Sequence, residues 1–279
     1  MIGFIGLGNI GGAMATRLLA HPDGLMVHDL RVEALVPFVE KGAKAGTIEQ
    51  VARDCSVISI VVLTDAQVRS VVAALLAHAA PGTVIAIHST IETGTAEELA
   101  VIALEKGVHL VDAPVSGGAF GAADGRLAVM VGGERAAYET AKPVFQHWAT
   151  LVLHLGPAGA GTKAKLARNL LTFAGYAVAA EANRLAEAAG LDLNKLAAVV
   201  RHSDQITGGP SAIMVRPVTA PMAADDGLRS IFEHSRTLGE KDLALALALG
   251  DSLGVDLPFA ALALRSLAAG LGVPHQEKT

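Results

Sequence analysis

The chain has 279 residues, of which 52% are hydrophobic and 18% are charged, and its formal net charge is −5. A disordered chain would combine low hydrophobicity with high charge, so this composition predicts a folded protein, and the length is typical of about two domains. The sequence pI of 6.0 argues against nucleic acid as a partner. Charged residues and glycines interrupt the long apolar windows, so we expect no membrane-spanning helix and no membrane partner.

Targeting and metal signals are missing from the sequence. The N-terminus lacks the basic segment of a signal peptide, and glycines interrupt its apolar run. The single cysteine, Cys55, excludes an internal disulfide framework and a multi-cysteine metal site. The histidines lack the HExxH spacing of a zinc site. We therefore expect a cytoplasmic protein that needs no metal.

The first 155 residues alternate short apolar runs with amphipathic segments such as 66–78 and 95–106, which we expect to be helices. Most of the apolar runs are too continuous for a strand that faces water on one side, so both of their faces should be buried. This alternation predicts a doubly wound, mostly parallel α/β sheet. The predicted strands are Ile2–Ile5, Leu25–His28, Val57–Val62, Val84–Ile87, Leu110–Val111, Ala128–Val131 and Leu151–Leu155.

The pattern changes to helical periodicity after Gly161, where a turn rich in glycine and proline is followed by a long helix from Thr162 to about Ala189. We expect an all-helical second domain, with domain limits of 1–161 and 162–279. This second domain is too apolar to be fully solvated. We therefore expect a homodimer or homotetramer in which the long helix and the helices around 243–249 and 260–267 bury surface against another subunit.

A glycine motif directly follows the first predicted strand and opens a helix. Gly6 would make the tight turn, Gly8 would let the backbone approach a pyrophosphate, and Gly11 would let the helix pack against the strand. Asp29, at the end of the second strand, is placed to bind a ribose 2′-hydroxyl, which favours NAD, whereas Arg31 leaves NADP open. The alternative is a turn of structural use only. The residues of the motif are Gly6, Leu7, Gly8, Asn9, Ile10 and Gly11.

Two further segments carry candidate chemistry. After the strand at 110–111, the hydroxyl of Ser116 and the N–H groups of Gly117 and Gly118 could hold a carboxylate, although such turns are also common without a ligand. On the long helix, Lys165 and Asn169 are four residues apart and share one face. A partly buried lysine can act as an acid or base near neutral pH, but most helical lysines are solvated, and that is the role we expect for Lys163.

Together these segments resemble the β-hydroxyacid dehydrogenase family, in particular its 3-hydroxyisobutyrate dehydrogenase group, over nearly the whole chain. The D-A-P-V-S-G-G segment of the family is intact at 112–118, and its G-x-G-x-x-x-K-x-x-N-N motif matches Gly159, Gly161, Lys165 and Asn169. Shorter matches are Leu63-Thr64, Ser89-Thr90 and Lys241-Asp242-Leu243. Three positions depart from the family pattern: Arg168 replaces the first asparagine of the N-N pair, Thr64 replaces a proline, and His234 lies in a segment where the family often has a phenylalanine near the nicotinamide. In an alternative alignment of that segment, Phe232 takes the place of the phenylalanine.

The resemblance implies a Rossmann-type dinucleotide-binding domain, a helical domain for substrate binding and dimerisation, and hydride transfer between NAD(P) and a small β-hydroxy acid. Lys165 would be the general acid/base, positioned with the substrate by Asn169. Ser116, Gly117, Gly118 and Lys241 would bind the substrate. The residues expected to bind the cofactor are Gly6, Leu7, Gly8, Asn9, Ile10, Gly11, Asp29, Leu63, Thr64, Thr90 and Lys241.

Three alternative functions stay open at this point. One is the reverse reaction, an NADP-dependent reduction of a semialdehyde or glyoxylate compound such as tartronate semialdehyde. Another is an imine reductase of similar architecture, against which Lys165 argues, because those relatives generally lack a lysine there. A third is a nucleotide-binding protein without turnover, which would have no need for Lys165, Ser116 and Asn169.

Overall fold

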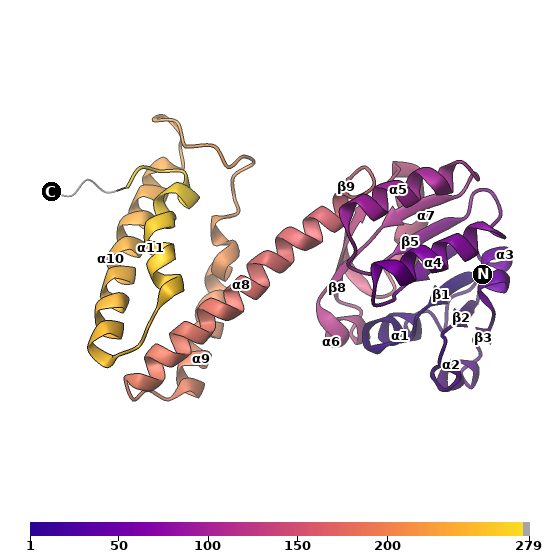
Figure 1. The fold of residues 1–279 in the computed structure, drawn as a ribbon, viewed down its shortest axis with the longest axis horizontal. Helices are drawn as coiled ribbons and strands as arrows, with labels where there is room; N and C mark the ends of the chain where they lie inside the picture. The colour runs from indigo at the N-terminus through magenta and orange to yellow at the C-terminus, as the bar shows by residue number, and fades with distance from the viewer. Residues whose placement is uncertain (276–279) are drawn as a thin grey trace. The chain divides into compact units, whose positions relative to one another are not determined.

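The computed structural model describes residues 1–275 and divides into two compact units, Met1–Asn169 and Leu170–Thr279 (Figure 1). The first unit is built on a nine-stranded sheet with the order β3-β2-β1-β4-β5-β6-β8-β7, in which β9 also pairs with β8. The strands are β1 (Ile2–Ile5), β2 (Leu25–His28), β3 (Lys44–Ala45), β4 (Val57–Ile60), β5 (Val84–Ile87), β6 (His109–Asp112), β7 (Val115–Ser116), β8 (Leu127–Gly132) and β9 (Ala149–Gly156).

The pairing of the strands confirms the predicted doubly wound sheet. All neighbours from β3 to β6 are parallel, and their order is that of a dinucleotide-binding fold. Only β8 runs antiparallel to its neighbours β6 and β7 among the described strands. The two-residue strands β3 and β7 carry too little apolar sequence to be predicted.

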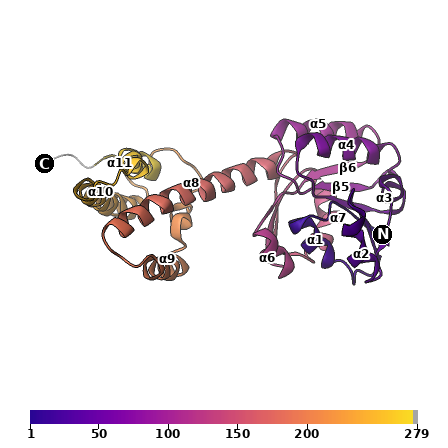
Figure 2. The same cartoon turned by 60° about the horizontal axis from the view of Figure 1, so that its bottom comes forward.

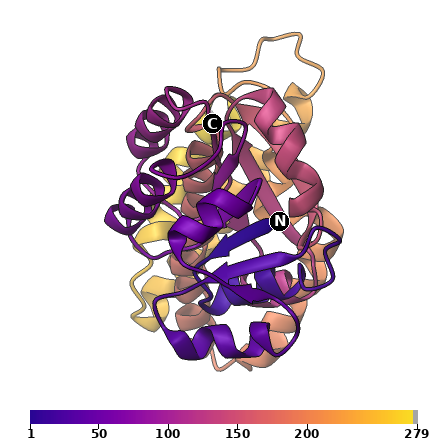
Figure 3. The same cartoon turned by 90° about the vertical axis from the view of Figure 1, so that its right-hand side faces the viewer.

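Helices cover both faces of the sheet (Figure 3). They are α1 (Asn9–Thr16), α2 (Val32–Val39), α3 (Ile48–Asp54), α4 (Asp65–Leu76), α5 (Thr93–Leu104), α6 (Gly118–Ala123) and α7 (Arg135–Phe145). Successive residues of a strand point to opposite faces, so Phe4 joins an apolar cluster with α1 and α7, and Ile5 joins a second cluster with α3, α4 and α5. As predicted, β1, β4 and β5 are buried along their whole length.

The expectation of burial on both faces is wrong for β9. Leu151, Leu153 and Leu155 are 49%, 46% and 43% exposed. Only the other face of β9 is covered, by α7, where the Tyr138 hydroxyl donates a hydrogen bond of 3.1 Å to the Val152 carbonyl. Strand β4 also ends at Ile60 rather than at Val62, because the Ser89 hydroxyl bonds both the N–H and the carbonyl of Val62.

The predicted long helix is present as α8 (Ala160–Ala188), which begins in the first unit and continues into the second. The second unit continues with α9 (Leu193–Thr207), a 3₁₀ turn (Gly209–Ile213), α10 (Arg229–Leu253) and α11 (Pro258–Leu271), and residues 170–275 contain no strand (Figures 1 and 2). The Glu181 carboxylate of α8 accepts hydrogen bonds from the first N–H groups of α11. Within residues 1–275, no helix combines the length and apolar character needed to cross a bilayer.

Candidate active site

The parallel strands β1, β2, β4, β5 and β6 end at one edge of the sheet, and the segments that follow them carry the predicted site residues of the first unit. Neighbours β1 and β4 lie where the strand order reverses direction, which is where ligands bind in open α/β sheets. Two bonds tie neighbouring loops at this edge. The Leu7 N–H donates to Asp29, and the Ser89 hydroxyl bonds Val62.

The three glycines of the first motif have different surroundings. Gly6 has a φ of +92°, and a Cβ there would overlap the Val61 carbonyl; a Cβ on Gly11 would overlap the Gly6 carbonyl. A Cβ on Gly8 would meet nothing within 4 Å. The chain therefore needs the first and third glycines for its own packing, while Gly8 leaves the start of α1 open. The free N–H groups of that helix start fit a dinucleotide pyrophosphate.

Asp29 is fixed in place by hydrogen bonds. Its carboxylate accepts from the Leu7 N–H at 2.7 Å and pairs with the Arg31 guanidinium at 3.1 Å. Burial raises the pKa of the Asp29 carboxyl, but the bonds from the Arg31 side chain, the Arg31 N–H and the Leu7 N–H outweigh it and hold the pKa below its usual value. The acidic residue thus stands against the glycine loop, as the sequence motif predicts, with a cationic group beside it.

The loops after β4 and β5 hold the next predicted residues. Thr64 is the N-cap of α4 and forms a reciprocal capping box with Gln67, so the threonine that departs from the family pattern has a structural role here. Leu63 is 91% exposed, and Thr90 is exposed as well. Their side chains are therefore accessible to a ligand at this edge.

The segment 112–118 crosses the edge beyond β6. Ser116 is partly exposed in β7, and Gly117 and Gly118 adopt φ angles of +131° and +67°, which only glycine adopts readily. Beneath this segment, His88 is fully buried, with Nδ1 2.7 Å from the Ala113 carbonyl and Nε2 3.0 Å from the Ser59 hydroxyl. Burial lowers the pKa of His88 to about 4, so this histidine is a neutral support of the segment.

Lys165 lies on the second turn of α8 next to this segment, and its Nζ donates a 2.7 Å hydrogen bond to the Val115 carbonyl. Burial, followed by the charge of Arg168, lowers the pKa of Lys165 from its usual value. Asn169 follows one turn later at the end of the first unit and is partly buried. Lys163, in contrast, is exposed and pairs with Glu97 at 2.8 Å.

Two family profiles match the chain. One is described as the NAD binding domain of 6-phosphogluconate dehydrogenase and covers residues 1–156. The other is described as the NAD-binding domain of NADP-dependent 3-hydroxyisobutyrate dehydrogenase and covers residues 159–277. The chain belongs to the β-hydroxyacid dehydrogenase family. It is an NAD(P)-dependent oxidoreductase of the hydroxyacid dehydrogenase type.

Relatives in the β-hydroxyacid dehydrogenase family match along nearly their whole length. An uncharacterized oxidoreductase of Mycobacterium tuberculosis is 58% identical, over 99% of this chain and 95% of that protein. An NAD-dependent L-serine dehydrogenase of Pseudomonas aeruginosa is 37% identical (94% and 89%). A 3-hydroxyisobutyrate dehydrogenase of the same species is 36% identical (99% and 94%).

Solved structures agree with this family membership. An oxidoreductase from Mycobacterium avium has a TM-score of 0.94 at 57% identity, covering 98% of this chain and 99% of that one. A 3-hydroxyisobutyrate dehydrogenase from Mycobacterium tuberculosis with L-serine has a TM-score of 0.68 at 30% identity (96% and 92%). An imine reductase from Myxococcus stipitatus, at 17% identity and a TM-score of 0.77, shares the fold alone.

Lys241 is the predicted site residue that does not lie in the first unit. It is on α10, where it is exposed and pairs with Asp242 at 3.0 Å. Sequence reasoning missed the supporting roles of Ser89 and the Asp112 carboxylate. Asp112 had a signal, since it is the first residue of the D-A-P-V-S-G-G segment, but its partners lie 47 and 50 residues away.

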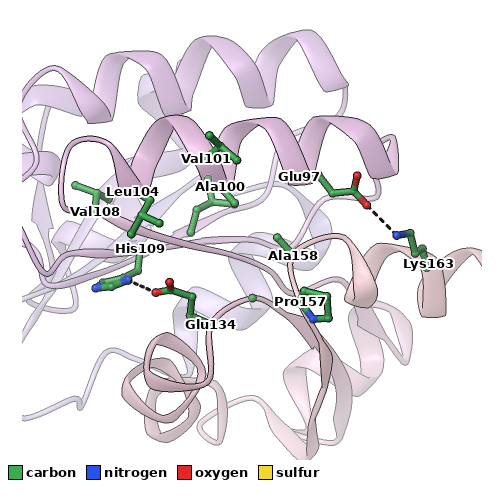
Figure 4. Close-up of a pocket in the computed structure, with 12 residues that line it drawn as sticks. Glu97, Ala100, Val101, Leu104, Val108, His109, Glu134, Pro157, Ala158 and Lys163 are labelled. Carbon is green, nitrogen blue, oxygen red and sulfur yellow. Dashed lines mark hydrogen bonds and ion pairs between the residues drawn. The ribbon is translucent and has the colours of Figure 1, made fainter.

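A pocket of about 520 Å³ lies elsewhere in the first unit, along α5 (Figure 4). Its rim carries the ion pair of Lys163 with Glu97 and a hydrogen bond between His109 and Glu134, and its wall includes Val101. None of its lining residues belongs to the predicted site. Within residues 1–275, no cluster of three or more His, Cys, Asp or Glu side chains could hold a metal ion.

Proposed function

We propose that this hydroxyacid dehydrogenase oxidises a small β-hydroxy acid of the 3-hydroxyisobutyrate type to its semialdehyde, with Lys165 as the general base. The observation that carries the proposal is the position of Lys165. Its partly buried amine lies against the Val115 carbonyl, one residue before Ser116, and its pKa is lowered. This places an amine that loses its proton more readily, and is therefore more available in its neutral, proton-accepting form, beside a segment suited to a carboxylate.

The substrate carboxylate is bound by the Ser116 hydroxyl and the N–H groups of Gly117 and Gly118. Gly118 supports this role, because a Cβ there would meet nothing within 4 Å and its N–H, at the first residue of α6, has no partner within that helix. Holding the carboxylate places the hydroxyl group two carbons away at a fixed distance from α8. This would speed the reaction by holding the hydroxyl group close to Lys165 and in a fixed orientation.

Lys165 takes the hydroxyl proton. Its neutral amine keeps one N–H on the Val115 carbonyl, which leaves the lone pair free for the substrate hydroxyl. In the reverse direction the ammonium form returns the proton to the carbonyl oxygen. Asn169, one turn further along the same helix face, orients Lys165 or the substrate by hydrogen bonds. The expected contribution of Lys241, a cation for the substrate or cofactor, stays a prediction.

A bound nicotinamide would supply the hydride acceptor for the hydroxyl-bearing carbon. The chain binds it through Gly6–Gly11, Leu63, Thr64 and Thr90, while Asp29 binds the adenosine ribose. The Leu7 N–H holds the Asp29 carboxylate at the glycine loop, which favours NAD. The Arg31 guanidinium, already beside Asp29, is the group that would accept the 2′-phosphate of NADP.

A second candidate is the reverse reaction, an NADP-dependent reduction of a semialdehyde such as tartronate semialdehyde, and the position of Arg31 favours it. An imine reductase is disfavoured by Lys165. A nucleotide-binding protein without turnover would not need the Lys165 amine, with its lowered pKa, next to Ser116.

The direct test begins with NADH and NADPH titrations followed by fluorescence. Turnover is then measured with both cofactors on 3-hydroxyisobutyrate, L-serine, glycerate, 4-hydroxybutyrate and glycolate, and on the semialdehydes in reverse. We expect NADH to bind and a branched or short β-hydroxy acid to have the highest kcat/KM. Binding of NADH without turnover of any hydroxy acid or semialdehyde would contradict the proposal.

We also propose a homo-oligomer that covers the apolar surface of the helical unit. Leu245, Leu249 and Leu262, on the helices predicted to be buried between subunits, are 61%, 44% and 51% exposed in the single chain. Light scattering at micromolar concentration should give at least a dimer, and a monomer would contradict this.

A further inference from the structure

One buried carboxylate of the first unit has no part in the scheme above. Asp112 ends β6 and is 0% exposed. Its Oδ1 accepts the Gly159 N–H at 2.8 Å, and its Oδ2 accepts the Thr162 N–H at 2.6 Å. Helix α8 begins at Ala160, so both donors lie at the helix end whose N–H groups have no partner within the helix. The negative group also lies at the positive end of the helix dipole.

Close backbone packing surrounds this contact. A Cβ on Gly132 would overlap Asp112 Oδ1 and lie 2.7 Å from the Gly161 nitrogen, and a Cβ on Gly161 would lie 2.6 Å from the Asp112 carbonyl oxygen. Glycine at both positions lets the first turn of α8 rest directly on β6 and β8. The carboxylate can therefore reach two amides of α8 at once.

The same two segments meet a second time at Lys165. Lys165 follows Thr162 by three residues, one helical turn, and Val115 follows Asp112 by three residues. The Asp112 carboxylate bonds the helix start, and the Lys165 Nζ bonds the Val115 carbonyl at 2.7 Å. The Asp112 contact fixes the rotation of α8 about its axis and its position along that axis. The Lys165–Val115 hydrogen bond then places the amine beside Ser116.

We propose that Asp112 is a positioning residue that sets the place of the Lys165 amine by anchoring the start of α8 to the sheet. The inference rests on the proposed role of Lys165. Asp112 touches neither substrate nor cofactor, so its loss should act on kcat and on the titration of Lys165 and leave cofactor affinity nearly unchanged.

Asp112→Asn is the sharpest variant, because the side chain keeps its size while one acceptor oxygen becomes an NH2 that faces an N–H donor. Asp192→Asn is the matched control. Asp192 caps α9 of the second unit by accepting from the N–H groups of Asn194 and Lys195, so the same chemistry is changed far along the chain from Lys165. We expect kcat to fall on the order of 10²-fold in Asp112→Asn, because catalysis is sensitive to displacements of about 1 Å. The Kd for NADH should change by less than about threefold, and Asp192→Asn should leave kcat unchanged.

A second readout does not depend on turnover. Reductive ¹³C-methylation of the lysines and NMR titration give the pKa of Lys165, with its signal assigned by its loss in Lys165→Arg. In the wild type this pKa should be lowered, and in Asp112→Asn it should rise as the amine becomes more hydrated. If no hydroxy acid is turned over but this pKa still rises in Asp112→Asn, the proposed function fails and the anchoring role stands. A fall, which the loss of the negative charge alone would produce, would contradict the anchoring role.

Several results would overturn the anchoring role. One is an unchanged Lys165 titration in a folded Asp112→Asn, and another is an equal loss of kcat in Asp192→Asn. Asp112→Ser, which keeps one acceptor, is measured in the same way if Asp112→Asn does not fold. In the wild type, the Gly159 and Thr162 amides should exchange with solvent as slowly as amides of β6. Rapid exchange of both would also contradict the proposal, whether or not any variant folds.

Discussion

The two units bury their apolar side chains to very different extents. In the first unit, Trp148, Phe4 and Phe145 are 0% exposed, and continuous apolar clusters line both faces of the sheet. In the second unit, Leu170, Phe173 and Tyr176 of α8 are 72%, 61% and 66% exposed. Its buried apolar residues among those described are Ala186, Met222, Phe232, Leu257, Ala268, Leu271 and Val273.

This difference in burial indicates that the two units are stabilised in different ways. The sheet unit has the core that an independent domain needs, and it holds Lys165 through contacts of its own. The helical unit leaves large apolar side chains in water, which a stable monomer of a soluble protein avoids. The core of the first unit lies within one chain, and the exposed apolar side chains of the second unit support the homo-oligomer proposed above.

The largest expected effect is on thermal stability, and its dependence on protein concentration should differ between the two units. Trp148→Ala removes a fully buried side chain and should cost about 3–5 kcal/mol, or on the order of 10 °C in Tm, at every protein concentration. Phe173→Ala should change Tm in a concentration-dependent way, because the proposed oligomer would cover its exposed ring. Thermal unfolding at several concentrations, with light scattering, measures both. If Phe173→Ala has the same Tm as the wild type at all concentrations, the proposed difference between the two units is wrong.

A smaller effect tests the polar interior of the first unit through pH. Burial lowers the pKa of His88 from 6.5 to about 4 in the folded chain, so between these values the unfolded chain binds a proton that the folded chain does not. Stability is therefore lost as the pH falls through this window, by about 2–3 kcal/mol between pH 7.5 and pH 4.5. His88→Gln cannot be protonated and should lack this part of the loss. Urea unfolding at both pH values would contradict the assignment if the two proteins lost stability equally.

The smallest effect concerns Arg168, one of the positions at which the chain departs from the family pattern. The charge of Arg168 contributes to lowering the pKa of Lys165, after burial. Arg168→Asn should therefore raise this pKa and move the rising limb of the pH–kcat/KM profile to higher pH. For an exposed charge the effect is about 1 kcal/mol or less, a factor of at most about five at pH 7. A shift to lower pH would show that Arg168 acts by another route.

Local features of the sequence predicted much of the geometry at this edge of the sheet. The glycine motif is contiguous, and the spacing to Asp29 is set by one helix and one strand, so the Leu7–Asp29 contact follows from local rules. The fold class likewise followed from alternating apolar and amphipathic segments. The long helix was predicted to within two residues of its start and one of its end.

Contacts between distant segments could not be predicted. The bonds from Asp112 to Gly159 and Thr162 depend on how α8 crosses β6 and β8, which no local pattern encodes. The exposed face of β9 was missed for a related reason, because an apolar run does not show whether a helix covers it. Lys241 and the domain limits of 1–161 and 162–279 stay predictions.

The central claim is that Lys165 is the proton acceptor of a site assembled at the edge of the first unit. The most direct test is the single-turnover rate of NADH formation for the wild type and Lys165→Ala, with saturating NAD and the best hydroxy acid. We expect a decrease of about 10²–10⁴-fold, the usual contribution of a general base, with the Kd for NADH unchanged. Equal single-turnover rates in the two proteins would contradict the account.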